Sequence, residues 1–248
     1  MFDMGKIMIV GIGPGNISDM TPKARLAIET AEVIAGYNTY IKLIPELVEG
    51  KKIIGTAMMQ EVDRCKMAID EVLTGKNVAL ISSGDAGIYG MAGLVIDMIL
   101  NQPEKIEFEV IAGISAVNAA SAILGAPLMH DFAVISLSDL LTDWELIKKR
   151  VECAAAGDFV IALYNPKSHK RVKNILEVQE ILLRHKNKNT PVGIVTNAGR
   201  LNERKIISTL ENFTNEEINM FSLVLIGNSL TYVKAGFMIT PRGYDLSN

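Results

Sequence analysis

The sequence predicts an α/β protein of two domains, and three observations predict it. Short apolar runs rich in Val and Ile recur along the 248 residues, separated by segments with apolar residues at three- and four-residue spacing. Hydrophobic residues make up 49% of the chain and charged residues 21%, which allows a substantial buried core. The length is large for one compact domain and small for three.

The first half is expected to form a parallel sheet. The run over residues 6–12 is rich in Ile and Val and leads into glycines, which is typical of a strand buried on both faces. Further strands are expected over residues 33–35, 52–54, 78–82 and 108–111. A helix is expected between Gln60 and Gly75, with an apolar stripe of Val62, Cys65, Ile69 and Val72.

The second half repeats this alternation. Strands are expected over residues 132–137, 159–164, 192–196, 206–209, 222–226 and 236–239. The longest helices are expected over residues 144–155 and 171–184. No Pro/Ser-rich linker separates the halves, so we expect the domains to be residues 1–113 and 114–248, divided where a strand ends in glycine.

Composition argues against several classes of function. The formal net charge of −3 gives no basic field for nucleic acid or an anionic membrane, and no stretch reaches the roughly 20 apolar residues of a spanning helix. We therefore expect a cytoplasmic protein without a nucleic-acid or membrane partner. Cys65 and Cys153 form no CxxC pair and His130, His169 and His185 show no ligand spacing. No metal site is expected, and both cysteines are expected to be buried.

A glycine-rich loop over residues 11–16 follows the first predicted strand, at the edge where open α/β sheets bind ligands. A dinucleotide fingerprint would have glycine at Asn16, Pro14 removes an amide that a phosphate would use, and the Gly-Lys-Ser/Thr of a Walker loop is absent. The loop therefore disfavours phosphate. It fits either a ligand held by backbone or a tight turn between strand and helix.

A second loop over residues 82–91 follows the fourth predicted strand. Gly84, Gly87 and Gly90 permit positive φ and close approach, so that backbone amides and carbonyls can bind an adenine edge or an amino acid. Asp85 either caps the helix that follows or supports a ligand. Two such loops on one sheet edge predict a pocket.

These loops resemble those of the tetrapyrrole methylases, or class III methyltransferases, which share a GxGPG loop at the first strand and a GDxG-type loop at the fourth. The segment 111–120 is similar to the helix start of that family. Four further segments resemble its precorrin-3B C17-methyltransferase branch, namely residues 136–139, 163–166, 195–200 and 239–244.

The resemblance implies two αβα domains with the active site in a trough between them, and a homodimer. It also implies S-adenosyl-L-methionine as the cofactor, S-adenosyl-L-homocysteine as the product and a tetrapyrrole, a corrinoid precursor, as the substrate. By position in the motifs, the cofactor would contact Gly13, Pro14, Ser83, Gly84, Asp85, Ala86, Ile88, Tyr89, Ser115, Ala116, Tyr164, Asn165, Ala198, Ser222 and Leu223.

The branch implies methylation of C17 of precorrin-3B, or of its cobalt form, with ring contraction in cobalamin biosynthesis. Methyl transfer from a sulfonium is an in-line displacement that depends on positioning in a dry site more than on catalytic side chains. The contraction needs a base, for which His130 and Asp131 are candidates because histidine titrates near neutral pH. A turn capped by Asp131 is the alternative. Tyr89 and Asp85 are other candidates for polar contact with the macrocycle.

Cations that could bind the substrate carboxylates gather near the expected start of the helix over residues 171–184. Lys167, His169 and Arg171 would oppose the helix dipole there unless an anion binds. Either a bound carboxylate or a solvated basic helix end is expected. Arg200 and Arg242 are further candidates for the same role.

Other functions make different predictions. A C11-methyltransferase of the same pathway or a diphthine synthase is an alternative within the family. The segments 164–171 and 239–244 argue against both, because they resemble the C17 branch. A nucleotide-dependent oxidoreductase would have a carboxylate at the end of the second strand, where Gly36 and Tyr37 stand. A non-enzymatic nucleotide-binding regulator would bind the cofactor without turnover.

Overall fold

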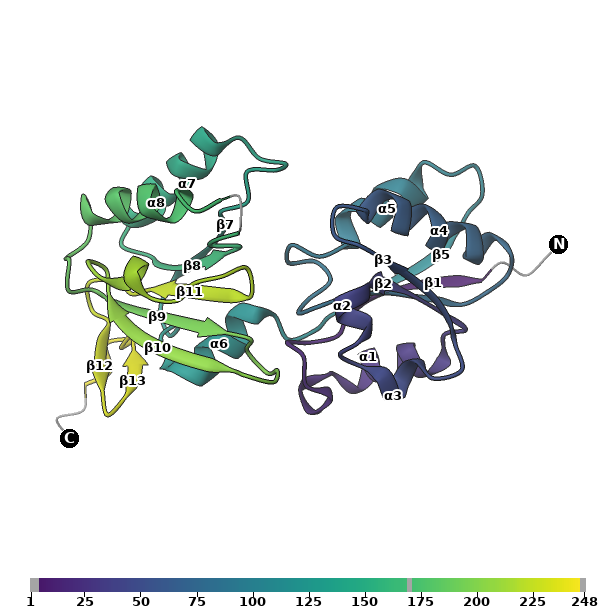
Figure 1. The fold of residues 1–248 in the computed structure, drawn as a ribbon, viewed down its shortest axis with the longest axis horizontal. Helices are drawn as coiled ribbons and strands as arrows, with labels where there is room; N and C mark the ends of the chain where they lie inside the picture. Colours follow the sequence, from purple (N-terminus) through teal and green to yellow (C-terminus); the bar gives the residue numbers. More distant parts are fainter. Residues whose placement is uncertain (1–4, 169–170, 246–248) are drawn as a thin grey trace. The chain divides into compact units, whose positions relative to one another are not determined.

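The chain folds into two compact units, Met1–Ala116 and Val117–Asn248, in a computed structural model that describes residues 5–168 and 171–245. Each unit has its own sheet and hydrophobic core, so the predicted α/β class is confirmed (Figure 1). Within those ranges, none of the helices has the length and apolar character needed to span a bilayer.

The first unit contains a five-stranded parallel sheet in the order β3-β2-β4-β1-β5, which confirms the parallel arrangement. Its strands are β1 (Lys6–Gly11), β2 (Val33–Tyr37), β3 (Lys52–Thr56), β4 (Val78–Ser82) and β5 (Glu107–Ile111). The central strands β1 and β4 are buried almost throughout, as their unbroken apolar sequence predicts. Gly11 pairs with Ser82, so the loops after β1 and β4 start side by side.

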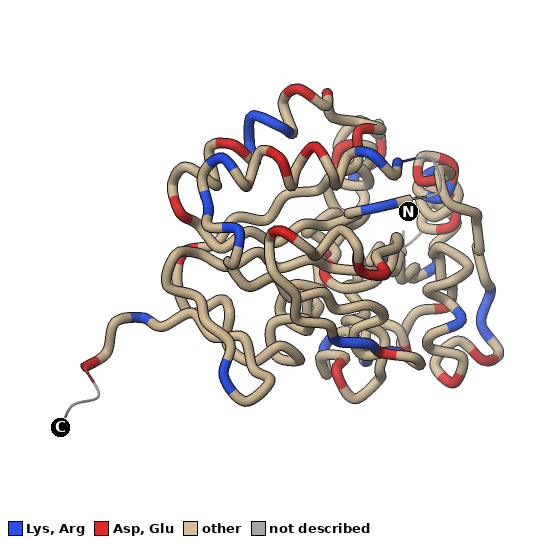
Figure 2. Tube along the Cα trace, turned by 60° about the vertical axis from the view of Figure 1, so that its left-hand side comes forward, with Lys and Arg blue, Asp and Glu red and all other residues tan. Residues whose placement is uncertain are grey.

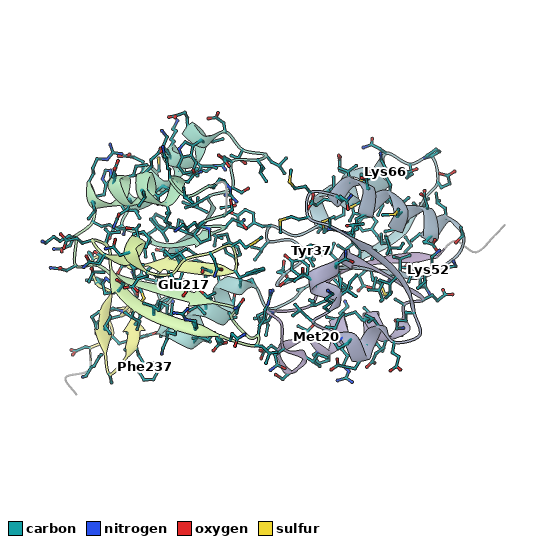
Figure 3. All side chains as sticks on the ribbon, viewed as in Figure 1. Met20, Tyr37, Lys52, Lys66, Glu217 and Phe237 are labelled. Atoms are coloured by element: carbon teal, nitrogen blue, oxygen red, sulfur yellow. The ribbon has the colours of Figure 1, made fainter. Side chains whose placement is uncertain are left out.

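Helices cover both faces of this sheet (Figure 1). On one face lie α4 (Glu61–Leu73) and α5 (Ala92–Leu100), and on the other α1 (Pro22–Thr30), α2 (Asn38–Ile41), α3 (Pro45–Val48) and the short 3-10 helix η1 (Ile17–Asp19). Met20 lies on the α1 side and Lys66 on the outward side of α4 (Figure 3).

One predicted core position of α4 is wrong. Val62 is 48% exposed, whereas Cys65, Ala68, Ile69 and Val72 are buried. At 100° per residue, Val62 lies about 70° from the centre of the stripe that the buried residues form, and so falls at its margin.

The second unit contains a mixed sheet in the order β10-β9-β11-β8-β7. Its strands are β7 (Phe132–Ser136), β8 (Val160–Tyr164), β9 (Pro191–Thr196), β10 (Arg204–Thr209) and β11 (Ser222–Ile226). β7 and β8 are parallel, whereas β11 is antiparallel to both β8 and β9. The carboxyl ends of β7, β8 and β9 therefore share one edge with the amino end of β11.

Helices also flank the second sheet. α7 (Trp144–Ala156) and α8 (Asn174–Leu183) share a core with the buried Phe213 of the 3-10 helix η2 (Phe213–Asn215). On the opposite face, Leu124 of α6 (Ala116–Leu124) lies against Gly193. A small sheet of β12 (Tyr232–Lys234), β13 (Phe237–Ile239) and β6 (Gly125–Ala126) completes the unit. β6 and β12 were not predicted, because two or three residues show no usable periodicity.

Two expectations for this unit are wrong. The helix expected over residues 171–184 begins at Asn174, because the Arg171 backbone is engaged by Ser168: Arg171 N donates to Ser168 Oγ (3.1 Å) and Ser168 N to Arg171 O (3.2 Å). Cys153 is exposed, since it lies on the outward side of α7 while Val151 and Ala154 face the core.

Candidate functional site

Three loops of the first unit meet at the carboxyl edge of its sheet. They follow the adjacent strands β4, β1 and β5 and span residues 82–91, 11–16 and 112–115. Gly13 N donates to Gly84 O (3.0 Å) and Gly84 N to Gly13 O (2.7 Å), while Ile12 N donates to Ser82 O (2.9 Å). The two predicted glycine loops are thus joined by backbone hydrogen bonds.

The third loop packs against the first two through glycine. A Cβ added to Gly113 would lie 2.5 Å from Gly11 O and closer still to Gly84 O, and one added to Gly11 would lie 2.7 Å from both Gly113 N and Gly84 O. Only glycine permits this approach of three backbones. Sequence reasoning did not assign Gly11 and Gly113 to the site, although glycine at or just after the end of a predicted strand is the signal that could have found them.

Asp85 ties the second loop to the third. Its Oδ1 accepts hydrogen bonds from Gly87 N (2.8 Å) and Ile88 N (3.2 Å), and its Oδ2 accepts one from Gly113 N (3.0 Å). The alternative of a helix cap is wrong, because α5 begins only at Ala92. Bonds to a charged acceptor are stronger than neutral ones, so Asp85 stiffens the loops.

Buried polar groups contact the second loop, residues 82–91, on its protein side. Ser82 Oγ accepts a hydrogen bond from Met91 N (3.2 Å). Arg64, only 3% exposed, donates to Thr56 Oγ1 (2.8 Å) and Ala57 O (3.1 Å), and its Nη1 lies 3.5 Å from Met91 Sδ. Sequence reasoning missed Arg64, whose place beside the buried Cys65 on α4 was the only signal.

The first-unit residues predicted to contact the cofactor all lie on these loops or directly after them. Pro14, Gly84, Ala86 and Ser115 are buried, whereas Ile88 and Tyr89 are 40% and 56% exposed. Tyr89 and Gly84 have left-handed backbone (φ +53° and +71°), and a Cβ added to Gly84 would lie 3.6 Å from Ala116 N at the start of α6. The loops therefore form one cradle lined by backbone.

This cradle fits a zwitterionic adenosyl amino acid. The loops contain glycine, small residues and one carboxylate but no lysine or arginine. Backbone amides and carbonyls can bind adenine and amino-acid groups, and the lack of cations suits a ligand that carries a positive sulfonium. Charged residues elsewhere are interspersed in sign along the trace (Figure 2).

In the second unit, the predicted cofactor residues lie at or near the sheet edge where β7, β8 and β9 end and β11 begins. Asn165 Nδ2 donates to Ser136 Oγ (2.9 Å), and the Tyr164 hydroxyl accepts from Val117 N (3.0 Å). Ser222 Oγ and Thr196 Oγ1 lie 2.7 Å apart at the same edge. The remaining predicted residues are Ala198, in the turn after β9, and Leu223, which is buried in β11.

The predicted carboxylate-binding cations divide into two groups. Lys167, Arg171 and Arg200 follow β8 and β9 on this edge, while His169 lies outside the described residues. The Arg171 guanidinium is directed at protein groups: Nη1 donates to Leu137 O (2.8 Å) and Asn165 O (3.4 Å).

Arg242 lies instead with the two candidate bases. His130, Asp131 and Arg242 line a cavity of about 430 Å³ together with Phe132 and Phe159. The cavity adjoins Phe132 at the amino end of β7. Ser136, at the other end of this strand, is four residues away, or about 13 Å at a rise of roughly 3.3 Å per residue. The structure thus brings these three residues together but separates them from Tyr164 and Asn165.

Comparison with known proteins agrees with these motifs. The profile of the Tetrapyrrole (Corrin/Porphyrin) Methylases matches residues 6–214. The chain belongs to the tetrapyrrole methylases. The resemblance inferred from the glycine loops is therefore confirmed.

Relatives match almost the whole chain. It is 48% identical, over 97% of its length and 100% of the relative's, to a probable cobalt-factor III C(17)-methyltransferase of Salmonella typhimurium. It is 49% identical to a cobalt-factor III methyltransferase of Priestia megaterium, of which it spans 45%, about half. A precorrin-3B C(17)-methyltransferase of Sinorhizobium sp is 34% identical, with 97% of each protein covered.

Solved structures share the fold. The methyltransferase CobJ aligns with a TM-score of 0.90 at 34% identity, over 96% of this chain and all of that one. A uroporphyrin-III C-methyltransferase from Thermus thermophilus, complexed with S-adenosyl homocysteine, aligns with a TM-score of 0.71 at 20% identity, over 90% of this chain and 97% of that one. The two-domain fold of this methylase family is thereby confirmed.

Proposed function

We propose that the protein is an S-adenosyl-L-methionine-dependent methyltransferase that methylates C17 of cobalt-factor III or precorrin-3B, with ring contraction, in cobalamin biosynthesis. The observation that carries this proposal is the 48% identity to a relative named for the C17 reaction and covered over its full length. We further propose a cytoplasmic homodimer, as the family resemblance implies.

The cofactor is proposed to bind in the cradle of the first unit. Ser83 and Ala86 would hold it through backbone groups, Gly13 and Gly84 would line the space it occupies, and S-adenosyl-L-methionine would supply an electrophilic methyl group there. The backbone contacts between the glycines fix the shape of the cradle before the ligand binds. Less conformational entropy is therefore lost when the ligand binds. Tyr164, Asn165, Ala198, Ser222 and Leu223 remain predicted contacts from the second unit.

The substrate is proposed to be held through its carboxylates by Lys167 and Arg200. Similarity favours the cobalt form, because the relatives named for cobalt-factor III are 48% and 49% identical to the chain and the relative named for precorrin-3B is 34% identical. Lysine would attract a carboxylate as a point charge, whereas the planar guanidinium of arginine can donate two parallel hydrogen bonds to it.

For the ring contraction, Tyr89 of the cradle is proposed in place of His130 and Asp131. The separation of His130 and Asp131 from Tyr164 argues against their acting at the edge where β8 ends. Tyr89 is exposed on the second loop and is the candidate for polar contact with the macrocycle.

Isothermal titration with S-adenosyl-L-homocysteine tests the cofactor site first. We expect micromolar binding by the wild type, none by Gly84→Trp, whose side chain would fill the cradle, and wild-type binding by Gly93→Trp, where nothing lies within 4 Å of the added Cβ. Circular dichroism would confirm that each variant is folded. No binding by a folded wild type would refute the proposal.

An anaerobic assay then tests the reaction. The protein is incubated with S-adenosyl-L-methionine and either cobalt-factor III or precorrin-3B, and the products are identified by mass spectrometry. We expect the mass of one added methyl group with the cobalt form. Binding of S-adenosyl-L-homocysteine without turnover of either substrate would favour a different methylase reaction.

A further inference from the structure

The side chain of Arg171 joins the ends of two neighbouring strands. It is 17% exposed, and its Nη1 donates to Leu137 O just after β7 and to Asn165 O just after β8. Its Nε lies 3.6 Å from Asp139 Oδ1. Nη1 is therefore committed to two carbonyls, and the negative charge of Asp139 beside the guanidinium would repel a substrate carboxylate.

The residues around Arg171 form one hydrogen-bonded unit. Ser136 Oγ accepts from Asn165 Nδ2 (2.9 Å) and from Ser138 N (3.2 Å), and Leu137 N donates to Tyr164 O (2.9 Å). The ends of β7 and β8 are therefore joined by Ser136, Asn165 and Arg171. Their joint effect is to fix the start of the loop that follows β7.

This loop presents two leucines to solvent. Leu137 is fully buried at one end, and at the other Asp143 caps α7 by accepting from Glu145 N (2.9 Å). Between these anchors, Leu140 is 64% exposed and Leu141 is 100% exposed. A loop held at both ends that carries adjacent exposed leucines at its tip suits a binding surface.

A third exposed leucine stands on the same sheet edge. Leu201, in the loop after β9, is 90% exposed. The ends of β7 and β9 are three strand spacings apart, roughly 14 Å. Lys167 and Arg200 lie on the same edge, so the loops combine apolar side chains with cations. This composition complements a tetrapyrrole, which has apolar faces and carboxylates at its rim.

We infer that Arg171 is a positioning residue that fixes the loop 137–143, and that Leu140 and Leu141 on this loop, with Leu201, contact the apolar face of the tetrapyrrole. The second part rests on the proposed function; the first does not. Arg171 thus acts on substrate affinity through the loop and binds no substrate carboxylate itself.

Limited proteolysis with thermolysin, which cleaves before leucine, tests the first part without any assay of activity. We expect Arg171→Met to raise the rate of cleavage at Leu140 and Leu141 about tenfold or more, because its loss frees the loop. The matched control is Arg184→Met, at the carboxyl end of α8, where Arg184 pairs with Glu152 (2.8 Å) and is 61% exposed. Equal cleavage rates in the two variants would overturn the positioning role.

Substrate kinetics test the second part. We expect Leu141→Ser and Arg171→Met each to raise the KM for cobalt-factor III about tenfold. Leu141→Ser should leave the affinity for S-adenosyl-L-homocysteine unchanged, because the loss of an exposed apolar contact weakens substrate binding alone. Leu100→Ser, at the end of α5 where Leu100 is 71% exposed, is the control and should behave as wild type.

Four outcomes separate the alternatives. A wild type that turns over with no change of KM in Leu141→Ser overturns the leucine contact, whereas a wild type without turnover defeats the proposed function and leaves the proteolysis result standing. Arg171→Lys that restores KM without restoring loop protection would overturn the positioning role in favour of direct carboxylate binding. Dissociation of an oligomer in Leu141→Ser would show that a second copy, not the tetrapyrrole, covers the leucines.

Discussion

The Asp85 carboxylate accepts a hydrogen bond from the Gly113 amide at 3.0 Å and so joins the loop after β4 to the loop after β5. The same carboxylate accepts two amides of its own loop, and Gly13 and Gly84 join the loop after β1 to this pair. Three adjacent strand ends are therefore locked together by contacts that involve backbone, with one acidic side chain at the centre. The geometry of the cradle depends on few groups, each of which can be changed singly.

Replacing Asp85 should weaken cofactor binding through the loops. Asp85→Asn removes the charge and offers only one acceptor oxygen, so it loses at least one of the three amide contacts. The loss of a charge-assisted hydrogen bond costs about 1.5–3 kcal/mol, so the Kd for S-adenosyl-L-homocysteine should rise roughly tenfold to a hundredfold in isothermal titration.

Comparison of two ligands distinguishes loop support from direct contact. If Asp85 acts only through the loops, Asp85→Asn weakens S-adenosyl-L-methionine and S-adenosyl-L-homocysteine by the same factor. A greater loss for the sulfonium would mean that the carboxylate faces its charge. The exposed Asp97 of α5 provides the control Asp97→Asn, and equal affinities in the two variants would contradict any role for Asp85 in binding.

The contact between Gly113 and its neighbours predicts a steric effect. In Gly113→Ala the new methyl would meet backbone oxygens of Gly11 and Gly84, which must shift. We expect a lower Tm and a Kd for S-adenosyl-L-homocysteine raised at least about tenfold, since overpacking typically costs about 1–3 kcal/mol. Gly93→Ala is the control: nothing lies within 4 Å of its Cβ, and alanine in a helix should be neutral or stabilising by roughly 0.5–1 kcal/mol. Similar Tm and Kd values in the two variants would show that the three backbones have room to separate.

Local patterns explain which parts of this fold the sequence predicts. The buried strands β1 and β4 are predicted because their apolar runs end in glycine loops, and the loops themselves mark the sheet edge that carries the cradle. The link between Asp85 and Gly113 spans strands that are adjacent in space but distant in sequence. No local periodicity encodes it.

The incorrect expectations have similar causes. The start of α8 is displaced because the backbone of Arg171 forms hydrogen bonds with Ser168, a competition that helical periodicity does not show. The exposure of Cys153 follows from the direction in which α7 presents its apolar face. His130 lies at the opposite end of β7 from Ser136, which residue type alone does not reveal.

The ion pairs of Glu109 predict a pH dependence of stability. On β5, Glu109 accepts from Lys23 Nζ (2.6 Å) and Lys6 Nζ (2.8 Å), and the hydrogen bond from Lys23, followed by that from Lys6, lowers the pKa of Glu109 from 4.5 to about 2. A depressed folded pKa contributes stability that is present above the unfolded pKa and is lost as pH falls toward the folded one. This contribution should therefore disappear between pH 4.5 and about 2.

Thermal unfolding of Glu109→Gln checks this dependence. Wild type should have the higher Tm near neutral pH, and the difference should shrink as the pH falls through this window and as salt is added, because exposed pairs are screened. Glu107→Gln is the control, since Glu107 lies 3.4 Å from Lys6 Nζ and its side chain is 75% exposed. A Tm difference for Glu109→Gln that stays constant down to the lowest pH would contradict the assigned pKa.

The two cysteines should react at very different rates. Cys153 is exposed on α7, whereas Cys65 is fully buried in α4, and burial raises the pKa of the Cys65 thiol to about 11. Because the thiolate is the reactive form, one cysteine of the native protein should react quickly with Ellman's reagent, releasing one equivalent of thionitrobenzoate, and the second should react only after unfolding in guanidinium. Cys153→Ser should abolish the fast phase, and Cys65→Ser should retain it. A fast phase in Cys153→Ser would mean that α4 opens from the sheet in the native protein, and with it the support that Arg64 gives to Met91 in the cradle.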